Sequence, residues 1–143
     1  MTLKGLTTLV EHEGFRDHAY QDSELFWTIG YGHLIDKRKG GRIKEKFLHM
    51  IFEDDVADKT QECKDAFPWF EELDPVRQDV IVNLTFNLGI EGLKGFKRMI
   101  EAIVQQQWAQ AAWELSNSKW KTQVQKDRHD DLTFALEKAR WRD

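Results

Sequence analysis

Residues 11–35, EHEGFRDHAYQDSELFWTIGYGHLI, decide the fold because their pattern differs from everything that follows. Two short aromatic and β-branched runs, residues 18–20 (HAY) and 26–29 (FWTI), flank the polar residues 22–24 (DSE). Such runs, separated by a few turn-forming residues, are typical of a β-hairpin. Glycines at 30, 32, 40 and 41 then mark a loop-rich stretch with room for one more short strand.

The residues before the hairpin have a helical pattern. Residues 2–12 are expected to form a short amphipathic helix that ends before Gly14, a residue type that often follows a helix. The apolar positions recur at helical spacing, namely Leu3, Leu6, Leu9 and Val10. This part of the chain therefore predicts helix followed by hairpin.

A long helix is predicted after the loop-rich stretch, over about residues 42–67. No glycine or proline interrupts it until Pro68, and its apolar residues fall on one stripe. Those residues are Ile43, Phe47, Leu48, Ile51, Phe52, Val56 and Cys63. A helix of this size spans about 36 Å, which is long enough to connect two lobes.

The remainder of the chain has only helical patterns. Pro75 sits where a helix favours its first residue, with Asp74 as the cap, and Gly89 is expected to end that helix. Three further helices are expected, beginning near Phe96, near Trp108 and at about residues 126–138. The sequence thus predicts a mostly α, α+β fold: an N-terminal lobe at about 13–45, the connecting helix, and a helical lobe at about 68–143.

Composition excludes several classes of protein. The chain has 143 residues, the length of one domain with at most two small lobes. Its single cysteine, Cys63, rules out an internal disulfide and a cysteine-based zinc site, and we expect it to be buried. A net charge of −4 argues against a nucleic-acid binder, and no apolar run approaches a membrane span or the core of a signal peptide.

Charge is distributed unevenly along the chain. Residues 1–50 carry 8 basic and 7 acidic side chains, whereas residues 51–143 carry 13 and 18. Six basic residues lie within residues 37–46, and Glu45 is the one acidic residue among them. Such a run is either a solvated loop that leads into a helix or a patch that meets an anionic polymer, and both interpretations stay open.

Glu13, Asp22 and Thr28 are candidates for chemistry. A helix end that faces a hairpin can bring two carboxyl groups and a hydroxyl together across a cleft. Glycoside hydrolysis needs one carboxyl group held protonated, to donate to the leaving oxygen, and a second held ionised. The spacing alone is also compatible with a surface glutamate and a turn aspartate, because the chain has 25 acidic residues.

The surroundings of these three residues resemble the phage lysozyme (endolysin) family, glycoside hydrolase family 24. The signature of that family is Glu, eight residues, Asp, five residues, Thr, which falls on Glu13, Asp22 and Thr28 without a gap. Neighbouring residues match as well: Glu13-Gly14, Tyr20-Gln21-Asp22 and Trp27-Thr28-Ile29-Gly30-Tyr31-Gly32-His33-Leu34.

The resemblance extends over nearly the whole chain. It includes residues 73–77 (LDPVR), the stretch from Asn83 to Gly89, the glycine corner before Phe96, and Arg128 with Trp141 thirteen residues later. It implies a single lysozyme-like domain with two lobes, in which the helix at 2–12 packs on the C-terminal lobe.

The resemblance also implies an activity. It indicates a muramidase that hydrolyses the β-1,4 bond between N-acetylmuramic acid and N-acetylglucosamine in peptidoglycan. Glu13 would be the general acid, Asp22 the second carboxylate and Thr28 a residue that helps to place water. Inversion at the anomeric carbon is expected, which requires carboxyl groups about 6.5–9.5 Å apart.

Supporting roles follow from the same resemblance. Arg128 is expected to pair with Glu13, and His33 to form a structural ion pair with Asp55. Candidates for contacts to sugar are Tyr20, Gln21, Trp27, Gly32, Leu34, Phe86 and Asn87. No metal and no other cofactor is expected, and the tryptophans other than Trp27 are expected mostly in the core.

The resemblance further indicates a biological setting. We expect a monomer that acts on peptidoglycan glycan strands, without nucleic acid and without membrane insertion. It would wait in the cytoplasm of the host bacterium until a separate pore-forming protein, a holin, opens the membrane, and would then reach the periplasm. A lytic transglycosylase and a non-catalytic peptidoglycan-binding module on the same scaffold remain as alternatives.

Overall fold

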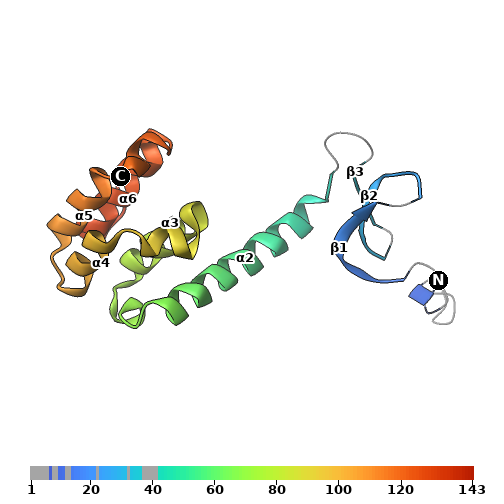
Figure 1. The fold of residues 1–143 in the computed structure, drawn as a ribbon, viewed down its shortest axis with the longest axis horizontal. Coiled ribbons are helices and arrows are strands. Elements are labelled where there is room, and N and C mark those ends of the chain that lie inside the picture. The colour runs from blue at the N-terminus through green and yellow to red at the C-terminus, as the bar shows by residue number, and fades with distance from the viewer. Residues whose placement is uncertain (1–6, 8–9, 12–13, 22, 32, 37–41) are drawn as a thin grey trace. The chain divides into compact units, whose positions relative to one another are not determined.

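The computed structural model describes residues 7, 10–11, 14–21, 23–31, 33–36 and 42–143 (Figure 1). The chain divides into two compact units, Met1–Ile51 and Phe52–Asp143. Helix α2, Glu45–Ala66, begins in the first unit and ends in the second, close to the expected connecting helix at 42–67.

The first unit contains an antiparallel sheet of three strands among its described residues. The strands are β1 (Arg16–Gln21), β2 (Trp27–Gly30) and β3 (His33–Asp36), in the order β1-β2-β3. The expected hairpin is therefore confirmed as β1 and β2, and the additional short strand as β3. Register irregularities occur in both strand pairs, between Arg16 and Tyr20 on β1 and between Trp27 and Thr28 on β2.

The helix expected at 2–12 lies largely outside the described residues. Thr7, Val10 and Glu11 are helical, and the backbone N–H of Gly14 donates to the Val10 carbonyl over 3.0 Å. Gly14 has a φ of 67°, in the left-handed region that favours glycine after a helix. The predicted packing of this helix on the C-terminal lobe stays a prediction.

The rest of the described chain is helical. Four α-helices follow α2: α3 (Pro75–Lys94), α4 (Lys97–Val104), α5 (Trp108–Ser116) and α6 (Lys126–Lys138), with 3₁₀ turns at Phe70–Glu72 and Lys119–Thr122. The expectation of a mostly helical α+β fold is confirmed. The first residues of α5 and α6 agree with the sequence pattern because their apolar periodicity is regular.

Helix α3 begins as expected and is broken at Gly89. The Asp74 carboxylate accepts the Arg77 backbone N–H at 3.1 Å, and Pro75 occupies the first turn. Gly89 leaves the helical conformation (φ 70°, ψ 161°), which confirms the predicted end of the first helical segment. A second helical segment, which the sequence did not predict, follows directly after this kink and reaches Lys94.

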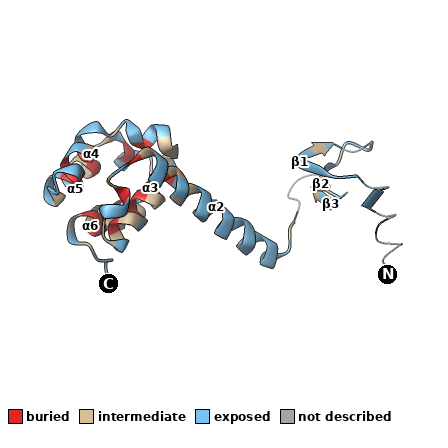
Figure 2. Ribbon diagram, turned by 90° about the horizontal axis from the view of Figure 1, so that it is seen from below, coloured by how far each residue is buried: buried red, intermediate tan, exposed pale blue. Residues whose placement is uncertain are grey.

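The core lies in the second unit, where Figure 2 shows the buried residues on the inward sides of the helices. Its members include Cys63, Phe70, Val80, Ile81, Leu84, Leu93, Met99, Ile103, Leu115, Trp120, Leu132 and Leu136. Of the five tryptophans expected mostly in the core, Trp120 is buried and Trp69 and Trp108 pack against the core, whereas Trp113 and Trp141 are exposed. Within the described residues, no helix is both long and apolar enough to cross a membrane.

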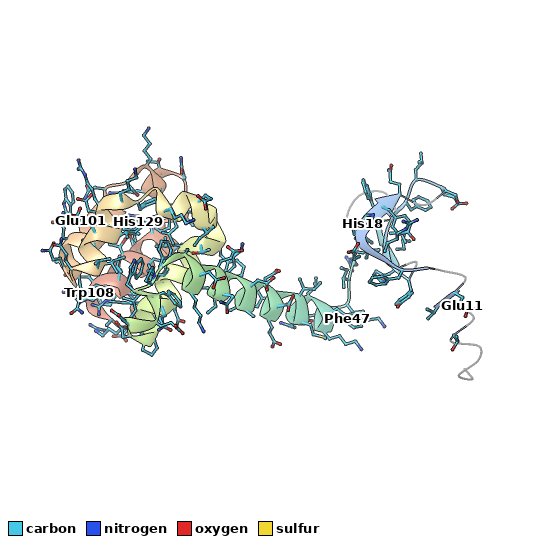
Figure 3. The ribbon with its side chains drawn as sticks, turned by 60° about the horizontal axis from the view of Figure 1, so that its bottom comes forward. Glu11, His18, Phe47, Glu101, Trp108 and His129 are labelled. Carbon is cyan, nitrogen blue, oxygen red and sulfur yellow. The ribbon has the colours of Figure 1, made fainter. Side chains whose placement is uncertain are left out.

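Arg77 joins the beginning of α3 to the end of α6. Its Nε donates to the Leu136 carbonyl and its Nη2 to the Glu137 carbonyl, both at 2.8 Å, while Nη1 meets the Asp74 carboxylate at 2.9 Å. The guanidinium carbon lies 3.7 Å from the ring centre of Trp108, which Figure 3 labels. These contacts satisfy carbonyls at the end of α6 and compensate the buried charge.

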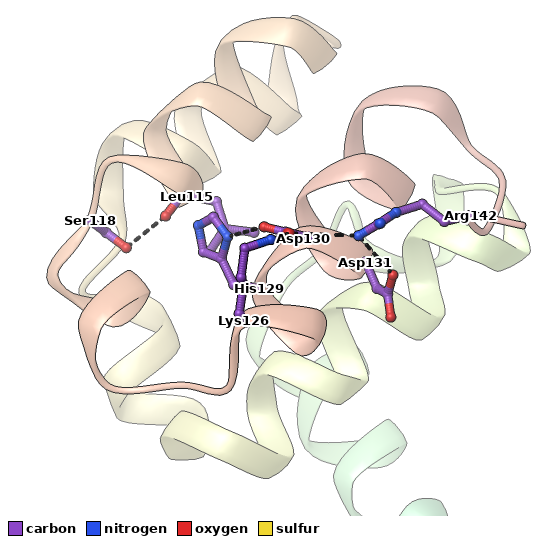
Figure 4. A network of polar contacts seen from close by, with 7 residues as sticks. All are labelled: Leu115, Ser118, Lys126, His129, Asp130, Asp131 and Arg142. Carbon is purple, nitrogen blue, oxygen red and sulfur yellow. Dashed lines mark hydrogen bonds and ion pairs between the residues drawn. The ribbon is translucent and has the colours of Figure 1, made fainter.

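A second polar network fastens the C-terminal residues to α6 (Figure 4). Asp130 accepts from Lys126 Nζ at 2.6 Å and lies 2.9 Å from His129 Nδ1, while Arg142 lies 3.3 Å from Asp131. The hydrogen bond from Lys126, followed by that from His129, lowers the pKa of the Asp130 carboxyl to about 2. The ionised carboxylate is thus the centre of this network.

Replacement of Arg77 by alanine should destabilise the protein by about 2–3 kcal/mol, since hydrogen bonds from a charged donor are lost at a buried position. Urea denaturation measures this loss. Arg98→Ala is the matched control, because Arg98 is exposed and forms no ion pair among the described residues, and it should cost less than about 0.5 kcal/mol. Equal losses in the two variants would contradict the role given to Arg77.

Asp130 should make stability depend on pH in the acid range. Its folded pKa of about 2 lies below the unfolded value of about 3.9, so the contribution is complete above about pH 4 and disappears as the pH falls towards 2. Urea denaturation between pH 2 and 5 should show that the free energy of unfolding of Asp130→Asn depends less on pH than that of the wild type. Asp127→Asn, which removes a carboxylate without an ion pair in the described chain, should keep the wild-type dependence.

Candidate active site

Of the three motif residues, only Thr28 is among the described ones. Glu13 directly precedes Gly14 in the sequence, and Asp22 directly follows Gln21, the last residue of β1. Both carboxylates lie outside the described residues, so their distance from Thr28 and from each other stays a prediction.

Thr28 occupies the centre of the sheet. It lies on β2, only 5% exposed, and its hydroxyl donates to the Phe26 carbonyl at 3.2 Å. Because the proton of the hydroxyl is used in this bond, its oxygen is available as an acceptor. A buried hydroxyl of this kind, on the central strand of the sheet, is suited to orient a water molecule.

Strand register brings several expected sugar contacts together. Tyr20 on β1 and Leu34 on β3 are the cross-strand partners of Thr28, so the three share one face of the sheet. Gln21 and Trp27 form the neighbouring cross-strand pair. Because successive side chains alternate between faces, this pair lies on the opposite face of the sheet. Trp27 is 46% exposed and Leu34 40%, so both present apolar surface.

The turn between β1 and β2 contains backbone strain. Leu25 has a φ of 66°, a conformation that a leucine rarely adopts. Its carbonyl accepts from Gln21 Nε2 at 3.4 Å, a contact that spans the turn. Asp22 belongs to this turn in the sequence and lies outside the described residues.

The remaining supporting residues of the motif region lie in different units or outside the described residues. Gly32 lies outside the described residues. His33 is exposed on β3 in the first unit, and Asp55 is exposed on α2 in the second. The expected His33–Asp55 ion pair would join the two units and stays a prediction.

Arg128 is held by Asn83 in the second unit. Its Nε donates to the Asn83 side-chain oxygen at 2.9 Å, and its Nη2 donates to the same oxygen at 2.6 Å and to the Asn83 backbone carbonyl at 3.0 Å. These contacts connect α6 to α3 across 45 positions of sequence. Glu13, the predicted partner of Arg128, lies outside the described residues.

A pocket of about 290 Å³ opens beside this pair. Its lining residues come from α2, α3 and α6, namely Phe52, Val56, Thr60, Asp79, Val82, Asn83, Phe86 and Arg128. The rings of Phe86 and Phe52 lie against each other at a tilt of 39°, with 6.1 Å between their centres. Aromatic walls with an amide, a carboxylate and a guanidinium are a suitable lining for a sugar.

Asn87 is engaged by the core. Its side-chain oxygen accepts from Trp120 Nε1 at 2.6 Å. This leaves the Asn87 amide NH₂ as the group that can donate to an acetamido oxygen. In the described part of the chain, no three histidine, cysteine or acidic side chains are arranged to hold a metal ion.

The sequence analysis did not assign roles to Asn83 and Phe52. Asn83, Phe86 and Asn87 have the spacing i, i+3, i+4, so their shared helical face could have been inferred. The position of Phe52 beside Phe86 could not be inferred, because the two residues lie on different helices and helical periodicity relates only residues of one helix.

Comparison with known proteins identifies the family of this chain. The model of the family described as phage lysozyme matches residues 10–138, which include the motif, the pocket and Arg128. The chain belongs to the phage lysozyme family.

Relatives of this lysozyme-family chain come from different sources. It is 31% identical over 138 residues to "Probable T4-type lysozyme 1" of Dictyostelium discoideum, covering 78% of the chain and 81% of that protein. An "Endolysin" of Acyrthosiphon pisum secondary endosymbiont phage 1 is 31% identical over 61% of the chain and 58% of its own length. "Pre-baseplate central spike protein Gp5" of Enterobacteria phage T4 is 27% identical over 87% of the chain but only 26% of its own length.

Replacement of Phe86 by alanine should raise KM for peptidoglycan fragments about fivefold, since about 1 kcal/mol of apolar contact is lost. Steady-state kinetics on soluble fragments measures the change. Trp113→Ala is the matched control, because Trp113 is an aromatic residue 56% exposed on α5, outside the pocket. An unchanged KM in Phe86→Ala would remove the pocket from the substrate site.

Proposed function

We propose that this lysozyme-family chain is a muramidase that hydrolyses the β-1,4 bond from N-acetylmuramic acid to N-acetylglucosamine in peptidoglycan. The observation that carries the proposal is the spacing of Glu13, Asp22 and Thr28 inside the region that matches the family. The burial of Thr28 at the centre of the sheet supports it, because a fixed hydroxyl serves catalysis better than a mobile one.

The proposed reaction needs two carboxyl groups in different protonation states. Glu13, held protonated, gives its proton to the glycosidic oxygen as the bond to the anomeric carbon breaks. Asp22, held ionised, stabilises the positive charge that develops on the sugar or takes a proton from the attacking water. One water is consumed for each bond broken. Of the two product fragments, one carries a new reducing end and the other a new non-reducing end.

We further propose that the reaction inverts the anomeric configuration. Water then attacks from the face opposite the leaving group, which is the reason for a wide separation between the carboxyl groups. The Thr28 hydroxyl, whose proton goes to the Phe26 carbonyl, offers its oxygen to such a water. This stereochemistry rests on the resemblance of the motif.

The substrate partner in this proposal is the glycan strand of peptidoglycan. Tyr20 and Leu34 on the sheet face of Thr28 and Phe86 in the helical unit are proposed to contact sugar rings. We propose a monomer that is held in the cytoplasm of a host bacterium until a separate holin opens the membrane. The relative named "Endolysin" comes from a phage, which supports this setting. The T4-type lysozyme relative from Dictyostelium discoideum is also compatible with a setting outside phage infection.

Replacement of Glu13 by glutamine should reduce turnover about 10³-fold without affecting folding, because it removes the proton donor and keeps the shape of the side chain. The measurement is the loss of turbidity of chloroform-treated Gram-negative cells. Glu11→Gln is the matched control, since Glu11 is an exposed glutamate two positions away, and it should clear cells at the wild-type rate.

Three results would contradict the proposal. Normal clearing by Glu13→Gln would exclude Glu13 as the acid. Mass spectrometry of the released ends distinguishes hydrolysis from transglycosylation, because anhydro ends in place of reducing ends would identify a lytic transglycosylase. Absence of clearing by the wild-type protein, with retained binding to cell walls, would favour the non-catalytic module.

A further inference from the structure

The contacts of Arg128 differ from those of an arginine that only stabilises a fold. Its three hydrogen bonds within the described residues all go to Asn83, and both acceptor atoms, the amide oxygen and the backbone carbonyl oxygen, are neutral. Nε and Nη2 are used in these bonds, so one edge of the planar guanidinium is fixed. The orientation of the remaining nitrogen is then fixed as well, because the group is rigid.

The positive charge of Arg128 has no carboxylate partner in the part of the chain that the structure describes. Asp79 lines the same pocket but forms no ion pair there. Arg77 provides the contrast within this chain, because its guanidinium is paired with the Asp74 carboxylate at 2.9 Å. Among the described residues, the buried Arg77 is neutralised by a carboxylate, whereas the half-buried Arg128 is oriented by neutral acceptors alone.

We propose that Asn83 is a positioning residue of the lysozyme reaction, which fixes the Arg128 guanidinium at the pocket and leaves its charge free for a carboxylate. The proposal rests on the proposed function. The carboxylate belongs either to the catalytic machinery of the enzyme or to the substrate, whose muramic acid and peptides carry carboxyl groups. Asn83 acts through Arg128 and touches neither the sugar nor water in this account.

The residue type at position 83 follows from this role. An amide oxygen accepts two hydrogen bonds from the guanidinium edge and adds no charge. Aspartate would hold Arg128 equally well but would neutralise it, so a second carboxylate would gain much less from the cation. An apolar residue would keep only the backbone carbonyl as an acceptor, so Nε would lose its partner and the guanidinium edge would no longer be fixed at two points.

A purely structural role makes a different prediction. If the pair only connects α3 to α6, Asn83→Asp should be harmless or stabilising, because an ion pair replaces a neutral contact. The positioning role predicts that the same variant retains its stability and loses activity. Asn83→Asp therefore separates the two roles in a way that Asn83→Ala, which weakens both, does not.

The experiment measures kcat and KM on soluble peptidoglycan fragments, with their pH profiles, for the wild type, Asn83→Asp, Arg128→Ala and the double variant. We expect Asn83→Asp to lose at least about tenfold in kcat/KM while its urea midpoint stays at or above the wild-type value. In the Arg128→Ala background, Asn83→Asp should have little further effect. Asn117→Asp, which adds the same charge at an exposed asparagine, should retain wild-type kinetics.

The division of the loss in kcat/KM between kcat and KM identifies the source of the carboxylate. A lower kcat with a displaced pH profile assigns it to the enzyme, and a higher KM with an unchanged profile assigns it to the substrate. Wild-type activity in Asn83→Asp, or an equal loss with and without Arg128, would overturn the proposal. Failure of the proposed function is distinguishable, because Glu13→Gln would then clear cells as the wild type does, whatever the result at position 83.

Discussion

The burial of one face of α3 is the constraint on which the helical unit depends. Val80, Ile81 and Leu84 are fully buried, and each such side chain contributes about 1.5–3 kcal/mol when it leaves water. Arg77, on the same face, fixes the end of α6 against this helix. Because the core holds α3 in one rotational setting, the adjacent face with Asn83 and Phe86 is presented to the pocket in a fixed orientation.

Two arginines in this unit illustrate how the same side chain can serve a fold or a site. Arg77 is buried, stacked on Trp108 and paired with Asp74, so its charge is used within the fold. Arg128 is held just as firmly, but by neutral acceptors. The electrostatic value of a fixed cation is largest where no carboxylate has already compensated it, which makes the second arrangement the one suited to chemistry.

Sequence reasoning was most successful where structure is local. The hairpin, the Asp74 cap and the helix at Lys126–Lys138 follow from residue type and short-range periodicity, and the structure confirms them. It predicted the break at Gly89 but not the helical segment that resumes directly after it. It did not separate the exposed Trp113 and Trp141 from the other tryptophans, because burial of a large side chain depends on which helices pack against it.

The sequence by itself determined the family, the three-residue motif and the division into a small sheet and a helical part, since these depend on spacing along one chain. Tertiary structure decided that Thr28 stands in one row with Tyr20 and Leu34, because strand register sets cross-strand partners. It also decided that Arg128 meets Asn83 across 45 positions. Such a contact depends on how two helices pack, which no local pattern of residues specifies.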